Sequence, residues 1–537
     1  MSWGSTAGCS ALLSLSLHQF IRHVEIDSRG WEMVFMYLGA LTLLFTGFLK
    51  ASGLGVTNAL LHTWLAGSTF LVVLLRRFPG PFAARLSNLY HMVIMKRTNM
   101  RYHRHMQELH VQYGDFVRTG PRELSIIRAS AIDLIYGPKS TCEKATWYDQ
   151  NSGNADMVGI ENVRSKKKHG IRRRAWDKGL GFRALGVYED RVKAKVDLLM
   201  ERIGTREPLN ITQQTIFYSF DVMGDIAFSE DFDMLHTGIE HPAIASLHDA
   251  MSIAGIVTTL PWLMNMLRVI PGATGRFERF AGWCTEQLNL KREALAKERA
   301  AGKEHEPRDV MTWLINAMNQ GDRSAPPSER AIQEDARTLI SAGSDTVAIT
   351  FTNTLYFLAT HPTTYRHLQT LLSTAFPAGP TSWTYAKSKS IPYIDYIIHE
   401  TLRLRPAVPM GFLRQTPPQG LQIDEIFIPG DTIVNVPTYT IQRDARYFAD
   451  PEAFRPERWE HLSPDTAAYL PFQRGGFTCS GRNLAVMQLR MLIANVALRY
   501  EVGFAEGEDG RGFWEGERET LTMWIPELRM MFRPRGE

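Results

Sequence analysis

Cys479 lies in a part of the sequence that suits a thiolate ligand of a metal ion. It follows Gly475 and Gly476 and precedes Gly481, and glycines allow a tight loop whose backbone approaches the sulfur closely. From Gly481 onward apolar residues recur at helical spacing, which places the cysteine at the N-terminus of a helix. The helix dipole favours an anion at this end, so the sulfur would be stabilised as a thiolate. Alone, the loop is weak evidence, because buried structural cysteines are far commoner than metal ligands.

A long helix is predicted over residues 330–360, between two prolines. Its middle, Ser341-Ala-Gly-Ser-Asp-Thr-Val347, is small and polar within an otherwise apolar stretch. Gly343 costs a helix about 1 kcal/mol relative to alanine, so its presence needs a reason. One reason is room for a diatomic ligand against the backbone, with Asp345 and Thr346 as an acid–alcohol pair that relays protons. The other is a helix kink at a packing contact, and the sequence leaves both open.

A third motif, Glu400-Thr-Leu-Arg403, places a carboxylate and a guanidinium on one helix face. Surface pairs of this kind are worth only about 0.5 kcal/mol. Prolines, short strands and then the segment Phe454-Arg-Pro-Glu-Arg-Trp459 follow. We expect Arg458 of this segment to complete a buried network with Glu400 and Arg403, made rigid by bidentate hydrogen bonds.

Taken in order, these motifs resemble those of the cytochrome P450 superfamily. The matching elements are the oxygen-activating helix motif Ala342-Gly343-x-Asp345-Thr346, the E-x-x-R pair, the P-E-R element and the cysteine loop. The likeness extends from Phe78 to the C-terminus. Three further segments resemble fungal secondary-metabolism members, the tryprostatin hydroxylases among them: Pro79-Gly-Pro81, Tyr113-Gly-Asp-Phe-Val-Arg118 and Phe504-Ala-Glu-Gly-Glu-Asp-Gly510.

The resemblance implies a haem-thiolate monooxygenase that binds haem b (heme b), with Cys479 as the axial ligand of the iron. A thiolate ligand donates electron density that favours cleavage of the O–O bond. Asp345 and Thr346, beside Ala342 and Gly343, would then supply protons to bound oxygen. The cofactor-binding positions that the resemblance implies are Cys479, Arg173, Arg414, His169, Phe472, Gly475 and Gly481.

One position departs from the family pattern. The residue two places before the cysteine is usually arginine or histidine, which meets a haem propionate, whereas here it is Phe477. By resemblance, Arg173 and Arg414 match the family's other propionate-contacting positions, and His169 stands where many members have tryptophan. We therefore expect haem retention to depend unusually on Arg173 and Arg414. A solvated basic face is the alternative for the run 172–174 that contains Arg173.

The fold expected is mainly α-helical with small β-sheets, the cytochrome P450 fold, in one large domain. The chain has 537 residues, 44% of them hydrophobic and 22% charged, which allows a large core and excludes wholesale disorder. Residues 116–119 and 123–126 predict a hairpin, and short strands are expected around 423–436. The cysteines lie far apart without a C-x-x-C pair, which excludes a disulfide framework and a zinc site.

The N-terminal region predicts a membrane anchor. Residues 33–49 and 51–75 carry no charged side chain, and a shorter apolar patch covers 11–17. The two longer runs approach or reach the roughly 20 residues that span a bilayer. We expect about two transmembrane helices, with the patch 11–17 as a third candidate, in residues 1–77, which precede the catalytic domain 78–537; a cleavable signal peptide is the alternative.

Basic residues that follow the last span place the catalytic domain on the cytoplasmic side of the membrane, by resemblance that of the endoplasmic reticulum. A net charge of +4 and a pI near 8.7 are too small to indicate a nucleic acid partner. They fit a membrane surface or an acidic protein partner.

Electrons must come from another protein, because the sequence has no glycine-rich flavin or nicotinamide motif. The resemblance implies an NADPH-cytochrome P450 reductase, with Lys166, Lys167 and Lys168 as a basic docking patch. The apolar, methionine-containing segment Met251–Pro271 predicts a substrate entrance at the membrane, with an amphipathic core helix as the alternative. It favours a hydrophobic substrate, such as a terpenoid or prenylated indole.

Two other functions fit the motifs less well. A haem-thiolate isomerase or dehydratase would need no reductase, but it would have no use for the Asp345–Thr346 pair. A non-catalytic haem-binding sensor or electron carrier would suit a closed pocket better than a helix opened at Gly343.

Overall fold

The computed structural model describes residues 77–536 except 151, 153, 268, 269 and 304, together with Gly39, Thr42 and Thr46. Apart from those three residues, the apolar runs predicted to form the membrane anchor lie outside the described residues. Among the residues that are described, no helix is both long enough and apolar enough to cross a bilayer. The anchor therefore stays a prediction.

Helices make up most of the domain. The α-helices are α4 (Phe82–Leu86), α5 (Leu89–Arg97), α6 (Tyr102–Tyr113), α7 (Ala129–Tyr136), α8 (Lys166–Leu180), α9 (Phe182–Ile203), α10 (Ile211–Phe228), α11 (Met234–Thr237), α12 (Pro242–Val257), α13 (Pro261–Leu267), α14 (Gly275–Ala300), α15 (Val310–Asn319), α16 (Glu329–Thr360), α17 (Pro362–Ala375), α18 (Tyr385–Ser388), α19 (Pro392–Leu404), α20 (Thr438–Ile441), α21 (Arg482–Arg499) and α22 (Arg511–Glu515). The 3-10 helices are η2 (Thr146–Gln150), η3 (Ala155–Met157), η4 (Ile160–Asn162), η5 (Gly379–Ser382), η6 (Pro456–Glu460) and η7 (Gly475–Phe477).

The strands are β1 (Phe116–Gly120), β2 (Glu123–Ile126), β3 (Glu143–Lys144), β4 (Leu209–Asn210), β5 (Arg414–Gln415), β6 (Leu421–Ile423), β7 (Ile426–Ile428), β8 (Ile433–Asn435), β9 (Tyr500–Phe504), β10 (Arg518–Thr520), β11 (Thr522–Trp524) and β12 (Arg529–Pro534). They form a five-stranded sheet in the order β1-β2-β8-β5-β3, a three-stranded sheet β4-β12-β9 and the hairpins β6–β7 and β10–β11. In the five-stranded sheet only β2 and β8 pair in parallel. The expected hairpin and the strands around 423–436 are therefore confirmed.

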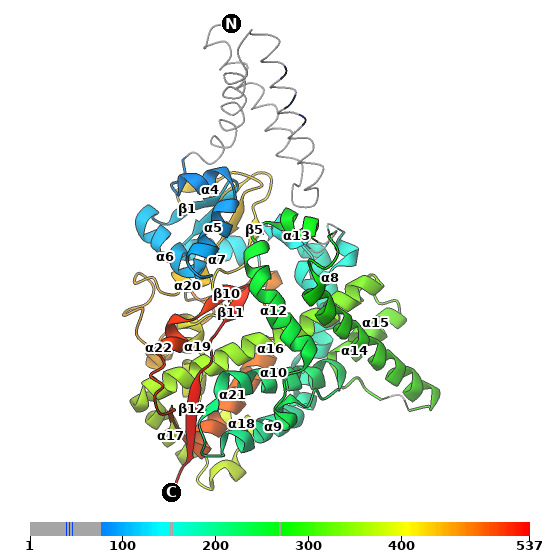
Figure 1. The fold of residues 1–537 in the computed structure, drawn as a ribbon, viewed down its shortest axis with the longest axis vertical. Helices are drawn as coiled ribbons and strands as arrows, with labels where there is room; N and C mark the ends of the chain where they lie inside the picture. The colour runs from blue at the N-terminus through cyan, green and yellow to red at the C-terminus, as the bar shows by residue number, and fades with distance from the viewer. Residues whose placement is uncertain are drawn as a thin grey trace.

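The long helix predicted over 330–360 is α16, and it crosses the middle of the molecule (Figure 1). The Ser328 side chain accepts a hydrogen bond from the backbone N–H of Ala331, so α16 begins with an ordinary N-cap. The proline at position 362 begins the next helix, α17. Ser328 and the proline at position 362 therefore mark the two ends of α16.

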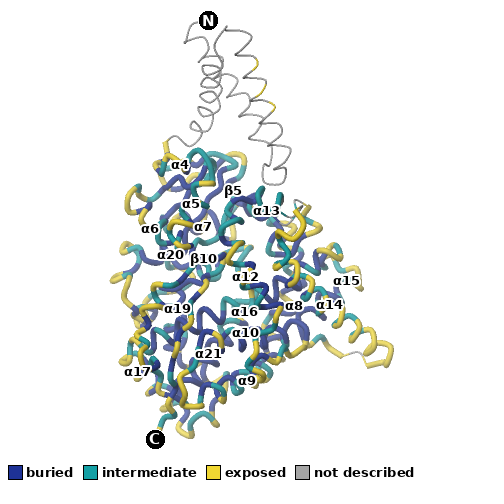
Figure 2. The backbone as a smooth tube through the Cα atoms, in the orientation of Figure 1, coloured by how far each residue is buried: buried dark blue, intermediate teal, exposed yellow. Residues whose placement is uncertain are grey.

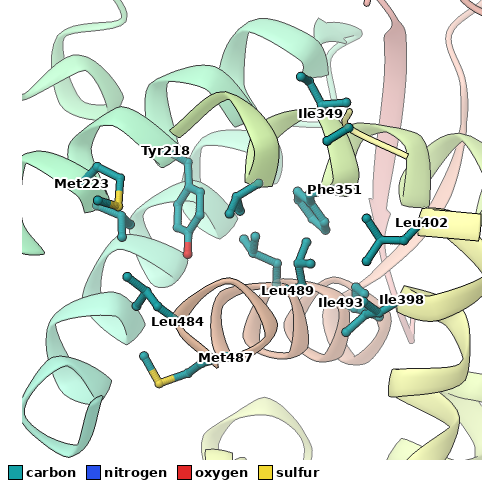
Figure 3. Close-up of a cluster of buried hydrophobic side chains, with 14 of the residues drawn as sticks. Tyr218, Met223, Ile349, Phe351, Ile398, Leu402, Leu484, Met487, Leu489 and Ile493 are labelled. Atoms are coloured by element: carbon teal, nitrogen blue, oxygen red, sulfur yellow. The ribbon is translucent and has the colours of Figure 1, made fainter. Parts of the chain in front are cut away.

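Helices α10, α16, α19 and α21 enclose the densest part of the core. Figure 3 shows their apolar side chains meeting, with Tyr218 and Met223 of α10 on one side and Leu484, Met487 and Leu489 of α21 on another. All five are buried. Figure 2 shows the same helices as the buried centre and α14 as an exposed arm. This core fixes α16 relative to α21, the two helices that carry the candidate catalytic motifs.

The segment Phe78–Pro81 is packed onto the sheet. Phe78 is buried, and the Pro79 carbonyl accepts a hydrogen bond of 2.7 Å from the backbone N–H of Arg118 in β1. A Cβ atom at Gly80 would lie 2.3 Å from the Arg118 carbonyl oxygen, so only glycine allows this approach. These contacts and the two prolines hold the start of the domain against the sheet.

Candidate active site

A partly open cavity of about 790 Å³ lies between α16, α21, α12 and the loop that precedes α21. Cys479, Asp345 and Thr346 all line it, although Cys479 follows the other two by more than a hundred residues. Met251 of α12 and Met264 of α13 lie on the same wall, as expected for the segment Met251–Pro271. The motifs selected from the sequence therefore meet at one cavity.

Backbone hydrogen bonds hold the cysteine loop in shape. The Cys479 N–H donates to the Phe472 carbonyl at 2.9 Å, and the Thr478 hydroxyl donates to the same oxygen at 3.1 Å. Gly475 has φ +65° in η7, and a Cβ atom there would lie 2.3 Å from the Tyr136 carbonyl oxygen. Glycine at 475 is thus required both by its backbone angle and by the close contact with the end of α7.

The Cys479 side chain is open to the cavity, while backbone and cationic groups surround the sulfur on its other sides. Burial raises the pKa of the Cys479 thiol, and the backbone N–H of Gly481 and the charge of Arg173 oppose that rise. The N–H and guanidinium of Arg482, at the start of α21, act in the same direction. The loop therefore provides the donors that a thiolate needs.

Three cationic or imidazole side chains gather around the Phe477 ring at the cavity edge. The Lys144 Nζ and the Arg414 guanidinium carbon each lie 4.8 Å from the ring centroid. The His169 ring meets Phe477 edge-on at 4.7 Å between centroids. Burial, followed by the charges of Lys144 and Arg173, lowers the pKa of His169 to about 2, so this imidazole is neutral.

Arg414 and Lys144 are buried cations without a carboxylate partner within the described residues. Lys144 donates to the carbonyls of Ile160 and Glu161 at 3.3 and 2.6 Å, and burial followed by the Arg414 charge moves the pKa of Lys144 well below its usual range. The Nε of Arg414 has no hydrogen-bond partner in the described part of the chain. Uncompensated buried cations are costly, so this end of the cavity suits a bound anion.

The run Arg172–Arg174 divides into different roles. Arg172 is buried and donates to Asp335 of α16 at 2.8 Å. Arg173 donates to the Thr478 carbonyl at 2.6 Å and to Asp177 at 2.6 Å, so it holds the cysteine loop. A solvated basic face would leave all three side chains exposed, but of the three only Arg174 is exposed. Whether Arg173 also meets a propionate stays a prediction.

On α16, Ala342 and Gly343 both border the cavity. A Cβ atom at Gly343 would lie 2.6 Å from the Cε of Met223 in α10. This contact favours the alternative reason for Gly343, a close packing contact between two helices. Room for a diatomic ligand at this residue stays a prediction.

Thr346 and Asp345, the acid–alcohol pair, have different hydrogen-bond partners. The Thr346 hydroxyl donates to the Ala342 carbonyl at 2.9 Å, one turn earlier in α16. The Asp345 Oδ1 lies 3.3 Å from Nε2 of His248 in α12, and Nδ1 of that histidine lies 2.9 Å from Oε1 of Glu240. No sequence pattern connected His248 or Glu240 to the site, because both precede α16 by about a hundred residues and neither belongs to a motif.

The Glu400 network forms as predicted. Arg403 Nε and Nη2 donate to the two Glu400 oxygens at 2.9 Å each, and Arg458 Nε donates to Oε1 at 2.9 Å. The Trp459 indole N–H and the Arg455 backbone N–H also donate to Glu400, at 3.0 and 2.8 Å. Glu400 and Arg403 are both fully buried at 0% exposure, so this network is structural and lies away from the cavity lining.

Together, these features test whether haem fits. A single Cys479 thiolate suits a haem iron, because the macrocycle brings the other equatorial ligands with it. Haem b brings them along with two propionates, and the cations beside Phe477 match those anions. The helical fold, the thiolate loop and the cation cluster define the class of haem-thiolate proteins.

Comparisons with known proteins agree with this class. The family model Cytochrome P450 matches residues 79–527, and the chain belongs to this family. Haem with a cysteine thiolate ligand is the cofactor of the family, and the chain is a cytochrome P450 monooxygenase by its relatives.

Three proteins that are similar to this chain come from fungi. Cytochrome P450 monooxygenase eupD of Phoma sp is 77% identical over 285 residues, which cover 53% of this chain and 100% of the relative. Cytochrome P450 monooxygenase FCK2 of Fusarium pseudograminearum (strain CS3096) is 34% identical over 542 residues, or 96% of both chains. Tryprostatin B 6-hydroxylase of Aspergillus fumigatus is 33% identical over 469 residues, which cover 86% of this chain and 81% of the relative. The sequence resemblance to fungal secondary-metabolism members is confirmed.

Proposed function

We propose that the chain inserts one atom of dioxygen into a hydrophobic secondary metabolite, of terpenoid or indole type, with electrons from an NADPH-cytochrome P450 reductase. The observation that carries this proposal is the common cavity of Cys479, Asp345 and Thr346. A thiolate loop on one helix and an acid–alcohol pair on another converge on a partly open apolar space.

The residues of the chain would divide the work as follows. Bound haem supplies the chemistry of oxygen activation. Cys479 would ligate the iron, and the N–H groups at the start of α21 would keep its sulfur anionic. Lys144 and Arg414 would bind the propionates. Thr346 would hold a proton at its hydroxyl, and Asp345 would replace that proton from the cavity edge.

The apolar wall made by α12 and α13 supports a hydrophobic substrate. Met251, Ala254 and Val257 of α12 line the cavity with Met264 and Leu267 of α13, and flexible methionines suit bulky apolar groups. One relative is named tryprostatin B 6-hydroxylase. These two observations favour hydroxylation of a large apolar metabolite.

Docking of the reductase on the cysteine side of the domain is supported by Lys167 and Lys168. Both are exposed at the N-terminal end of α8, which packs against η7 of the cysteine loop. Lys166 differs from the other two, because its Nζ donates to the Pro138 and Ser140 carbonyls at 2.7 and 2.8 Å. Lys168 also lies 3.7 Å from Asp156 Oδ1 in an exposed ion pair, so Lys167 and, less freely, Lys168 would supply the charge of the proposed patch.

A membrane location, in the endoplasmic reticulum with the domain facing the cytoplasm, follows from the apolar residues before position 77. Exposed apolar side chains on the domain support it: Phe82 of α4 is 64% exposed and Ile270, which follows α13, is 50% exposed. Helices α4 and α13 lie at the same end of the molecule (Figure 1). A bilayer at this end would cover both side chains.

Metabolite profiling of a fungal host that expresses the chain with its reductase tests the function. We expect a compound heavier by one oxygen atom that is absent from the same host carrying Cys479→Ala. Growth under labelled dioxygen should transfer the label to that compound. A product that forms without the reductase, or without label, would instead assign the chain to isomerase or dehydratase chemistry.

A further inference from the structure

A chain of three ionisable side chains runs from the protein surface to the cavity. Glu240 precedes α12, His248 lies within α12, and Asp345 lies in α16. The side chains become less exposed along this chain, at 34%, 24% and 13%. Only the Asp345 end lines the cavity. The chain therefore connects the solvent-facing side of α12 with the acid of the oxygen-activating motif.

Both ring nitrogens of His248 act as donors at neutral pH. Burial lowers the pKa of His248, but its hydrogen bonds to Asp345 and Glu240, together with their charges, outweigh burial and raise the pKa to about 10. The protonated ring donates from Nε2 to Asp345 Oδ1 at 3.3 Å and from Nδ1 to Glu240 Oε1 at 2.9 Å. An imidazolium between two carboxylates is a charge-assisted pair of hydrogen bonds.

The surrounding helices fix the orientation of the His248 ring. The Phe220 ring of α10 meets it edge-on, with 5.8 Å between the centroids. The neighbouring α12 residues Leu247, Ala250 and Met251 line the cavity. His248 thus sits on the helix that forms the substrate-facing wall, and its bond to Asp345 ties that wall to α16.

We propose that His248, held by Glu240, is a positioning residue that fixes the Asp345 carboxylate at the cavity edge and thereby sets the supply of protons for oxygen activation. This inference rests on the proposed monooxygenase function. The Asp345 carboxylate has no hydrogen bond other than the one from His248 within the described residues. Without His248, the carboxylate would be free to turn toward solvent, because nothing else in that part of the chain orients it.

Proton supply decides how electrons from NADPH are used. With too few protons at the active site, one NADPH, one proton and one dioxygen give NADP⁺ and hydrogen peroxide. With an adequate supply and no substrate, two NADPH and two protons reduce one dioxygen to two waters. The peroxide released per NADPH therefore reports proton delivery without knowledge of the substrate.

The test uses the full-length chain in phospholipid vesicles with NADPH-cytochrome P450 reductase. The variants are His248→Phe, which removes both hydrogen bonds, and His248→Arg, which keeps the positive charge and donors to both carboxylates. His236→Phe is the matched control, since His236 is 76% exposed and, among the residues that the structure describes, pairs only with Asp233, at 3.5 Å. Two readouts are compared: peroxide released per NADPH, and the infrared stretching band of carbon monoxide bound to the reduced protein.

We expect His248→Phe to shift or broaden the carbon monoxide band and to slow NADPH oxidation or raise peroxide release, by on the order of twofold or more. His248→Arg should restore both readouts toward the wild type, and His236→Phe should match the wild type. A Phe variant with an unchanged band and unchanged peroxide release would overturn the proposal. So would an Arg variant as defective as Phe, because positioning by charge would then be insufficient.

The carbon monoxide band separates failure of this inference from failure of the proposed function. A wild-type protein that does not oxidise NADPH with the reductase would contradict the monooxygenase proposal. The band would still show whether His248 positions the carboxylate, because it requires only reduced protein and carbon monoxide. A band that is identical in all variants contradicts the role of His248 whatever the outcome of the NADPH assay.

Discussion

The hydrogen-bond networks around Glu400 and around Asp345 differ in how many hydrogen bonds each carboxylate accepts. Around Glu400, both carboxylate oxygens accept several hydrogen bonds, and Arg403 donates also to the carbonyls of Gln442, Pro451 and Ala453. Around His248, one oxygen of Asp345 accepts one hydrogen bond of 3.3 Å. Glu400 and Arg403 of the first network are fully buried, whereas the second network borders the cavity and reaches the surface at Glu240.

This difference indicates what each network can do. A saturated buried network is rigid, and losing one partner leaves an unpaired charge inside the protein. A carboxylate with open acceptor positions can exchange a proton, provided that a neighbour keeps it oriented. The Glu400 network therefore holds α19 against η6, and the Asp345 network suits chemistry. The cations beside Phe477 resemble the Asp345 network in this respect, since Arg414 also keeps an unpaired donor at the cavity among the described residues.

The largest expected effect comes from breaking the saturated network. Glu400→Ala leaves the Arg403 and Arg458 guanidinium groups buried without their carboxylate, which costs about 3–5 kcal/mol. That cost is a large fraction of the 5–15 kcal/mol, roughly, by which domains are stable. We expect little folded haem protein, measured by haem absorbance and thermal unfolding. Near-normal yield and unfolding temperature would contradict a structural role for this network.

Replacing the proposed iron ligand should remove ligation while the fold survives. Cys479→Ala deletes the thiolate but leaves the hydrogen bond from the backbone N–H of residue 479 to the Phe472 carbonyl available. We expect the red-shifted Soret band of the reduced carbon monoxide complex to disappear, with far-ultraviolet circular dichroism unchanged. The same band persisting in the variant would remove Cys479 as the ligand.

The cations beside Phe477 can be tested with one substitution that weakens haem binding and a second that restores it. Lys144→Met should weaken haem binding by on the order of tenfold, the effect of losing one charge-assisted hydrogen bond of about 1.4 kcal/mol. Adding Phe477→Arg, which restores the usual family residue, should recover the loss. Lys168→Met is the control, because its side chain is exposed. Haem transfer to apomyoglobin measures retention, and equal rates in all these variants would exclude Lys144 from propionate binding.

The smallest expected effect is a pH dependence of stability. Because the pKa of His248 is raised to about 10 in the folded protein from an ordinary value of 6.5, its charge stabilises the fold fully below pH 6.5 or so and less as pH rises toward 10. The unfolding temperature of the wild type minus that of His248→Phe should therefore shrink from pH 6.5 to pH 10. A difference that grows over this interval would have the wrong sign for an imidazolium between two carboxylates.

The sequence by itself determined the elements and their order. Prolines and a serine cap bounded α16, apolar spacing predicted α21, and the spacing of Glu400 and Arg403 placed them on one helix face. These are local features, so the periodicity of the chain reveals them. The positions of Cys479, Asp345 and Thr346 followed from motifs of this kind, and the cavity they share agrees with the expectation.

Only the tertiary structure decided which residues support the motifs. Lys144 reaches the cavity because its strand pairs with the distant strand of Arg414, and His248 of α12 reaches Asp345 of α16. Met223 supplies a packing reason for Gly343, and Lys166 binds loop carbonyls although its neighbours stay exposed. Such contacts depend on how distant segments pack, and no local pattern records them. The sequence therefore predicted the candidate catalytic groups, while the fold determined which side chains lie against them and balance their charge.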